Sequence, residues 1–184
     1  MQNKPLRNLI KGIIGGIITL LILTFIIRNS SVFYRKIIIL PFQLHLNKQD
    51  LVLKKGEEYH LFVYGINKWV SYHSTNFRVA GVNFNGRVFA YQTGKAFIVA
   101  KVDGKELKCR VRVIDINKDK ITLSVGDSAR LKVTGPAHFP RWRSSDPNVA
   151  TVSMFGRVKG KSKGSTVITA RWKGKEVKCK VRVK

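Results

Sequence analysis

The sequence is poor in acidic residues and in cysteine. Only ten of its 184 residues are Asp or Glu, against 35 Lys and Arg, so the formal net charge is +25. Its two cysteines, Cys109 and Cys179, exclude a small scaffold held together by several disulfides. Each lies in an alternation of apolar and polar residues, which predicts that each thiol is buried in a core as a small hydrophobic group.

The chain also lacks the residue groupings on which catalysis depends. An active site needs titratable side chains that converge, but most of the ten acids lie at expected turns. Neither cysteine has a CxxC partner, and no Gly-rich phosphate loop is present. The histidines show no metal-ligand spacing, and they are His45, His60, His73 and His138. We therefore expect no catalytic residues, no metal and no cofactor.

A repeat of seventy residues organises most of the chain. Gly86-Arg87-Val88 recurs as Gly156-Arg157-Val158, and the segment 108–113 recurs as 178–183 without a gap. Within each copy, short alternating segments are separated by Gly, Pro, Asn and Asp, which is typical of an all-β sandwich with about seven strands. We expect strands near 51–53, 58–64, 68–73, 78–83, 86–91, 95–102 and 106–113, and at the same positions plus seventy. The boundaries predict one domain at 50–114, a linker at 115–119 and a second domain at 120–184.

The second copy resembles a known family in the order and spacing of its motifs. These motifs are Leu-Ser-Val-Gly-Asp at 123–127, Trp-Arg-Ser-Ser-Asp-Pro-Asn-Val-Ala-Thr-Val at 142–152, Gly-Arg-Val-Lys-Gly at 156–160 and Gly-Ser-Thr-Val-Ile-Thr-Ala at 164–170. Together they are similar to the bacterial immunoglobulin-like domain, group 2. The first copy is a diverged match, since Tyr72 stands in the place of Trp142. The resemblance implies two tandem Ig-like β-sandwich domains of the kind found in bacterial surface and adhesion proteins, such as the intimin and invasin type.

A long apolar run stands near the start of the chain. Residues 12–27 carry no charge, and the stretch 9–27 is close to the length that crosses a bilayer as a helix. We therefore expect a basic tail at 1–11, a transmembrane helix at 9–27 and a stalk at 28–49. A cleaved signal peptide is the alternative, but no small-x-small site follows the run. A prepilin-like leader cut after Gly12 is a third, although it would lack its usual early acid.

The membrane prediction has consequences for location and partners. Basic residues flank the run on both sides, so charge does not set the orientation. The resemblance to surface proteins implies a single-pass protein of the cell membrane with extracellular C-terminal domains. Gly12 and Gly16 have the spacing of a small-xxx-small helix contact. These glycines either pair helices into an oligomer or are merely tolerated in the apolar run.

Basic residues alternate with apolar ones along several predicted strands. Residues 120–184 carry 16 Lys and Arg against three acids, and residues 50–114 carry 11 against five. Period-two alternation places such residues on one face, about 6.5–7 Å apart. One interpretation is a surface for polyanions, such as wall teichoic acid, anionic lipid headgroups or nucleic acid; the other is a solvated face that prevents edge aggregation. The candidate binding residues are Lys108, Arg110, Arg112, Arg157, Lys159, Lys161, Lys163, Arg171, Lys173, Lys178, Lys180 and Arg182.

The sequence as a whole predicts binding or spacing rather than catalysis. We expect a membrane-anchored surface protein whose basic face meets an anionic cell-wall polymer or lipid. Specific nucleic acid binding is not expected, because few aromatic residues on these strands could stack on bases. The alternative is a structural or accessory subunit of an envelope assembly or filament, which packs against a protein partner or its own copies through the N-terminal helix.

Overall fold

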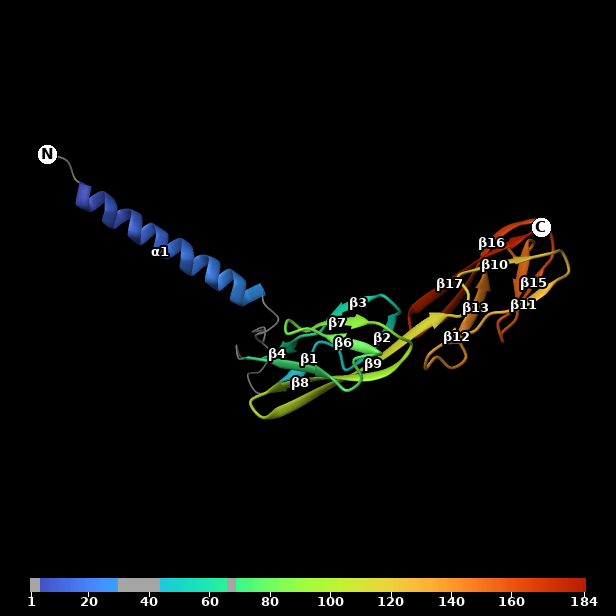
Figure 1. Cartoon of the computed structure of the whole chain (residues 1–184), viewed down its shortest axis with the longest axis horizontal. Helices are drawn as coiled ribbons and strands as arrows, with labels where there is room; N and C mark the ends of the chain where they lie inside the picture. The colour runs from blue at the N-terminus through green and yellow to red at the C-terminus, as the bar shows by residue number, and fades with distance from the viewer. Residues whose placement is uncertain (1–3, 30–43, 66–68) are drawn as a thin grey trace.

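The protein consists of one N-terminal helix followed by two groups of β-strands (Figure 1). The structure is a computed structural model that describes residues 4–29, 44–65 and 69–184, with helix side chains from 11 to 26. The expected stalk at 28–49 falls largely outside these residues, as does the apolar stretch 37–42 within it. We call residues 44–116 the first unit and residues 120–184 the second unit.

Helix α1 extends over Lys4–Asn29 and so includes most of the stretch expected to be a basic tail. The predicted transmembrane segment, 9–27, lies inside it. Between Ile13 and Ile26, its large apolar side chains are 51–67% exposed. Among the residues described, no helix reaches the length and apolar character that a membrane crossing requires.

The first unit is built from two sheets and a short strand pair. Its main sheet joins β5, β8, β9 and β2, and a smaller sheet has the order β3-β7-β6, while β1 pairs with β4. The strand bounds are β1 His45–Leu46, β2 Asp50–Lys54, β3 Glu58–His60, β4 Val63–Tyr64, β5 Ser71–Ser74, β6 Ala80–Val82, β7 Arg87–Ala90, β8 Gly94–Val102 and β9 Lys105–Ile116.

The second unit has the same arrangement. One sheet has the order β10-β17-β16-β13 and the other the order β11-β15-β14. The strand bounds are β10 Lys120–Leu123, β11 Ser128–Arg130, β12 Val133–Thr134, β13 Arg141–Ser144, β14 Ala150–Val152, β15 Arg157–Gly160, β16 Gly164–Trp172 and β17 Lys175–Val183. Both units are thus all-β and sandwich-like, which confirms the predicted class of fold for this part of the chain.

The seventy-residue repeat is also present in the strand register. Asp50 pairs with Arg110 in a parallel ladder, and seventy residues later Lys120 pairs with Lys180 in another. The ladders form because alternate residues are apolar and face inward: β17 alternates buried and exposed positions from Glu176 to Val183. One difference from expectation is that the stretch 58–64 forms two short strands, β3 and β4.

Each unit has its own apolar core between its two sheets. The first core contains Ile98, Val111 and Cys109, and the second contains Ile168 and Cys179, all essentially inaccessible to solvent. Full burial of each such aliphatic side chain stabilises the fold by roughly 1.5–3 kcal/mol. Both cysteines are unpaired thiols at these buried positions, as the sequence predicted.

A glycine turn fixes the central aromatic side chain in each unit. Gly156 has a φ of +77°, and a Cβ there would lie 2.3 Å from the Leu131 carbonyl oxygen and 2.9 Å from the Trp142 ring. Gly86 repeats this geometry against Leu61 and Tyr72 in the first unit. Only glycine combines this backbone angle with so close an approach. Trp142 is half-buried against the second core.

Strand β9 connects the two units without a break. Its last residues, Asp115 and Ile116, pair with β12 of the second unit, in the way that β1 pairs with β4 in the first. One strand therefore closes the first unit and opens the second. The linker expected at 115–119 is shorter than predicted, because only residues 117–119 lie between β9 and β10.

Candidate functional site

The basic ladder of the first unit, Lys108, Arg110 and Arg112, is paired with nearby acids. The Lys108 ammonium lies 3.5 Å from the Glu106 carboxylate, and the Arg110 guanidinium lies 3.4 Å from Asp50. Arg112 also pairs with Asp50. Burial raises the pKa of the Asp50 carboxyl, but the hydrogen bonds and charges of Arg112 and Arg110 outweigh it and hold that pKa below its usual value. Each cation of this ladder therefore has an acidic partner, while the Lys108 and Arg110 side chains stay more than half exposed.

Two of the predicted polyanion residues lie at the junction between the units. The Arg112 side chain is only 11% exposed, and its guanidinium lies over the Trp172 ring, 5.2 Å from the centroid. Lys173 also lies near this ring, at 5.7 Å, and its ammonium is 3.8 Å from Asp50. Val52 and Ile114 of the first unit pack into the second core beside them. Arg112 and Lys173 thus hold the units together, and Arg112 is too buried to meet a polymer.

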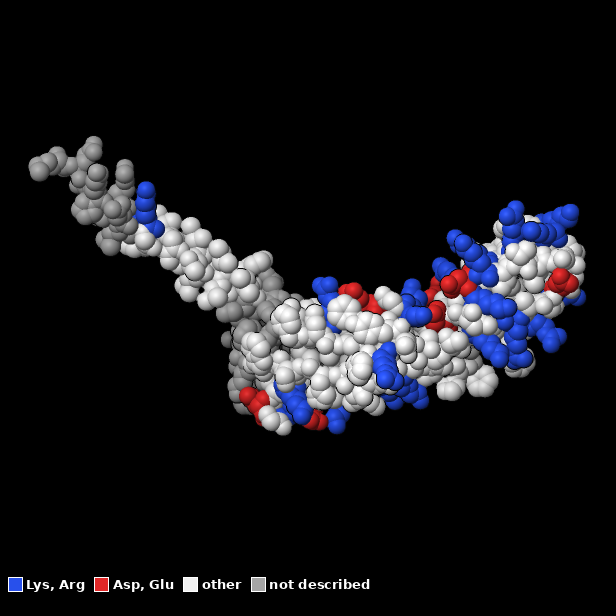
Figure 2. All heavy atoms as spheres, in the orientation of Figure 1, with Lys and Arg blue, Asp and Glu red and all other residues white. Residues whose placement is uncertain are grey.

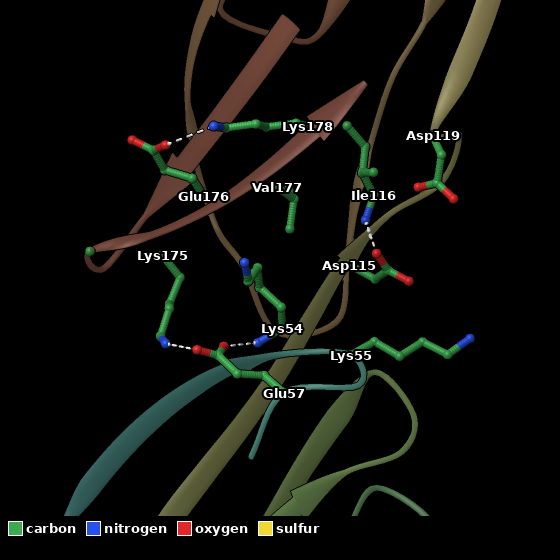
Figure 3. A pocket seen from close by; sticks show the side chains of 11 residues that line it. Lys54, Lys55, Glu57, Asp115, Ile116, Asp119, Lys175, Glu176, Val177 and Lys178 are labelled. Atoms are coloured by element: carbon green, nitrogen blue, oxygen red, sulfur yellow. Dashed lines mark hydrogen bonds and ion pairs between the residues drawn. The ribbon is translucent and has the colours of Figure 1, made fainter. Parts of the chain in front are cut away.

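A pocket of about 530 Å³ lies at the junction between the units (Figure 3). Acids and bases alternate around it, and Lys175 of the second unit reaches Glu57 of the first. The backbone N–H of Lys54 donates a second hydrogen bond to Glu57. Burial raises the pKa of the Glu57 carboxyl, but these hydrogen bonds outweigh it, so the pKa lies below its usual value. Since its charges are used between the units, we interpret this pocket as structural.

The basic residues of the second unit are divided between its two sheets. Lys178, Lys180 and Arg182 are exposed on β17, and Arg171 is exposed on β16 of the same sheet. Arg157 and Lys159 belong to β15 in the other sheet. Lys161 and Lys163 lie in the turn between β15 and β16. The predicted set is therefore not one continuous ladder, and only its β16 and β17 members share a face.

The face shared by β16 and β17 carries a shallow depression of about 370 Å³, which we call the distal groove. Parallel pairing puts Lys120 of β10 beside Lys180 and Thr122 beside Arg182, with all four side chains exposed. Hydroxyl groups contribute from the other side. The lining residues are Lys120, Ile121, Thr122, Ser145, Ser165, Thr166, Val167, Lys180, Val181 and Arg182.

The distal groove is positively charged and lacks acids. None of its lining residues is acidic, and in the described part of the chain no carboxylate forms an ion pair with Lys120, Lys180 or Arg182. Glu176, at the end of the same face, lies 3.9 Å from Arg171 and from Lys178; such exposed pairs are weak. Figure 2 shows the basic side chains gathered over the end of the molecule that carries the second unit.

Sequence reasoning missed several residues of this face. Lys120, Arg141 and Arg143 were not among the predicted binding residues, although Arg141 and Arg143 alternate around Trp142 and are exposed on β13. A comparison of the two copies could have identified Lys120, since it stands seventy residues after Asp50. Among the described residues, no group of three or more His, Cys, Asp or Glu could hold a metal ion.

The sandwich-like second unit also has a match among known domain families. Residues 110–181 match the family model of the bacterial Ig-like domain, group 2. This match covers the end of β9 and nearly all of the second unit, and it agrees with the resemblance seen in the motifs. No significant match was found among curated proteins.

Several solved structures are similar to the chain at low identity. An S-layer protein, rSbsC(31-844), is 22% identical with a TM-score of 0.35; the alignment covers 78% of this chain and 28% of that one. A C-terminal fragment of intimin, solved in complex with the intimin-binding domain of its translocated receptor, is 17% identical with a TM-score of 0.45, covering 78% and 64%. Extracellular domains 3–5 of Drosophila OTK are 12% identical with a TM-score of 0.31, covering 78% and 66%.

Proposed function

We propose that this chain is a surface-associated binding and spacer protein with two tandem Ig-like domains. Helix α1 attaches it to a membrane, and the second unit presents a basic face to anionic polymers of the cell envelope. One observation carries this proposal: an exposed apolar helix and an unneutralised basic surface lie at opposite ends of the chain, with the first unit between them (Figures 1 and 2).

The helix supports membrane attachment through its exposed apolar surface. Ile17, Ile18, Leu20 and Leu21 are each more than half exposed, and such consecutive positions lie on different sides of a helix. A helix that is apolar all round is normally buried in protein or lipid, and a large exposed apolar surface marks an interaction site. Lipid is the partner that covers every side of a single helix.

The junction supports a spacer role. Strand β9 belongs to both units, and the Glu57–Lys175 pair and the Arg112–Trp172 contact join them further. A continuous strand with lateral contacts resists bending more than a free linker does. The second unit is therefore held at a defined distance from the point where the chain meets β1.

The test is the distribution of the chain between membrane and soluble fractions after expression in a bacterium. We expect the full chain in the membrane fraction and a chain lacking residues 1–29 in the soluble one. Ile17→Asp with Leu21→Asp should also release it, because an ionised side chain at the centre of a membrane helix costs about 2.5–3.5 kcal/mol. Thr19→Ser is the matched control in the same helix. Retention of the doubly charged variant in the membrane would contradict attachment through α1.

A second candidate function is a structural or accessory subunit that packs through α1. Within the described residues, a Cβ added at Gly12 or Gly16 would meet nothing within 4 Å, so this surface is open to a second helix. The two functions differ in the mass of the detergent-extracted protein. A monomer supports the first. An oligomer that dissociates when Gly16 is changed to Leu supports the second.

A further inference from the structure

We propose that the distal groove is a binding site for a linear phosphodiester polymer. The inference rests on the proposed function, since it names the ligand of the basic face and the residues that hold it. The site consists of Lys120, Lys180 and Arg182, with Thr122 and Ser165 on either side of Arg182. A polymer would lie along β10 and β17 and place successive phosphates against successive cations.

The first argument is the arrangement of charge. Lys180 and Arg182 are two residues apart on β17, which separates their Cα atoms by about 6.5–7 Å, and Lys120 lies beside Lys180 on the neighbouring strand. Three like charges this close repel one another and destabilise the sheet. A bound polyanion removes that repulsion and gains charge-assisted hydrogen bonds, including the bidentate contact that arginine makes with phosphate.

The second argument comes from the same corner of the first unit. There, Asp50 pairs with both Arg110 and Arg112, and Val52 and Ile114 form the apolar contact on which the second unit packs. Seventy residues on, the acid has become Lys120, the two apolar residues have become Thr122 and Lys184, and Arg182 replaces Arg112. A corner that carries an acid and packs against protein in one copy is thus an open, basic and hydroxyl-lined groove in the other.

The third argument selects the class of polyanion. None of the described lining residues is aromatic, so the groove offers no ring on which a nucleic acid base could stack. Serine and threonine hydroxyls can donate hydrogen bonds to the two non-bridging oxygens of a phosphodiester, beside the cations that balance its charge. The groove lies on the second unit. Strand β1, where the described chain enters the first unit, lies at the end of the first unit that is farther from the second unit (Figure 1). Headgroups of the membrane that holds α1 therefore lie away from the groove, whereas a polymer that extends from that membrane can reach it.

The test is binding of the full chain, in neutral detergent, to synthetic poly(glycerol phosphate) over a salt series. The informative variant is Lys120→Asp, which restores the acid that the first unit has at this position. We expect it to weaken binding more than tenfold and to flatten the salt dependence, because fewer counterions are released. Lys132→Asp makes the same change of charge at an exposed site outside the groove and should weaken binding less than threefold.

Other probes separate the remaining sources of affinity. Binding should be weaker for poly-glutamate of equal charge, for single-stranded oligothymidylate and for anionic phosphatidylglycerol vesicles. Equal loss in the Lys120→Asp and Lys132→Asp variants would overturn the groove and leave only binding by net charge. Equal affinity for poly-glutamate or vesicles would overturn the phosphodiester assignment, as would a second copy of the chain bound through Lys120. Equal affinity for the oligothymidylate, which is itself a phosphodiester chain, would overturn the exclusion of nucleic acid. Because no membrane is needed in the polymer assay, its result does not depend on membrane attachment by α1, which the fractionation experiment tests separately.

Discussion

At the scale of single residues, the two units depend on positions that allow no substitution by a larger residue. Gly156 and its counterpart Gly86 each bring the backbone against a carbonyl oxygen and the face of an aromatic ring. The ring of Trp142 is thereby packed between the glycine and the second core. Such a glycine is required both by its backbone angle and by the space around it, and these two requirements can be separated experimentally.

We expect Gly156→Ala to lower the free energy of unfolding by roughly 2–4 kcal/mol, about 1–2 from the left-handed backbone and the remainder from crowding against Leu131 and Trp142. Gly174→Ala is the control, because its φ of +80° is similar but nothing lies within 4 Å of the added Cβ. Gly174→Ala should lower the free energy of unfolding only by the backbone contribution of about 1–2 kcal/mol. The urea midpoints of the wild type and the two variants measure the backbone contribution and the crowding contribution. Equal losses in the two variants would show that the close contact has no energetic role.

The two thiols give a second prediction at this scale. Burial raises the pKa of Cys109 to about 12 and that of Cys179 to about 11, and the nearby Asp50 and Asp119 carboxylates contribute. At pH 8, at most about one thiol in 1,000 is then the reactive thiolate. We expect neither cysteine to react with an aromatic disulfide reagent in the native protein, and both to react in urea. A rapid reaction of one thiol in the native protein would contradict its buried position.

At the scale of elements, β9 determines how the two units are joined. It contributes Val111 to the first core and Ile114 to the second, so one strand stabilises both. The predicted linker was too long because four of the five residues at 115–119 are polar and look like a connection, whereas Asp115 and Ile116 pair with β12. Pairing between residues far apart in sequence decides where a strand ends, and a local pattern does not contain it.

Ile114→Ala should destabilise the second unit although the residue lies in the first. Its side chain is completely buried, and the loss from such a truncation is roughly 2–5 kcal/mol. Amide exchange should become faster in β16, which carries Ile168. The control is Val111→Ala, which removes an equally buried side chain of the same strand and should accelerate exchange in β8 instead. Faster exchange in β8 for both variants would contradict the shared role of β9.

The junction carboxylates predict how stability depends on pH. Both Asp50 and Glu57 have a pKa below their ordinary values of 3.8 and 4.5. A carboxyl of this kind stabilises the fold above its unfolded pKa, and the contribution is lost as the pH falls through the lower, folded pKa. Protonated Asp50 would also leave the buried Arg112 charge without its partner.

We therefore expect the urea midpoint to fall as the pH is lowered from about 5 to about 3. The fall should be less steep in Glu57→Gln, which has lost the titrating group. Glu58→Gln is the control, since that carboxylate forms only an exposed pair with Arg87 and lies outside the junction. The Glu57→Gln and wild-type curves should converge at the acid end. Parallel curves over this range would show that the Glu57–Lys175 pair does not couple to stability.

At the scale of the whole molecule, the sequence predicted the class of fold and much of the ladder chemistry. Period-two alternation identified β17 and its exposed cations, and the repeat predicted that both copies share one arrangement of strands. The sequence did not predict which of these described cations lack an acidic partner. Arg112 and Arg182 have the same local pattern, but Asp50 and Trp172 cover the first and none of the described acids pairs with the second. That difference depends on tertiary contacts with residues about sixty positions away.

The parallel pairing of the first and last long strands in each unit also determines how the molecule would respond to stretching. β2 lies parallel to β9, and β10 lies parallel to β17. Tension applied between the start of β2 and the end of β9 therefore pulls the two strands past each other, and their hydrogen bonds are loaded together instead of opening one at a time. Because β9 continues into the second unit, that tension passes directly to its sheets. A protein fixed at a membrane by one end and held by a polymer at the other would experience force along this direction, in which the ladders are strongest.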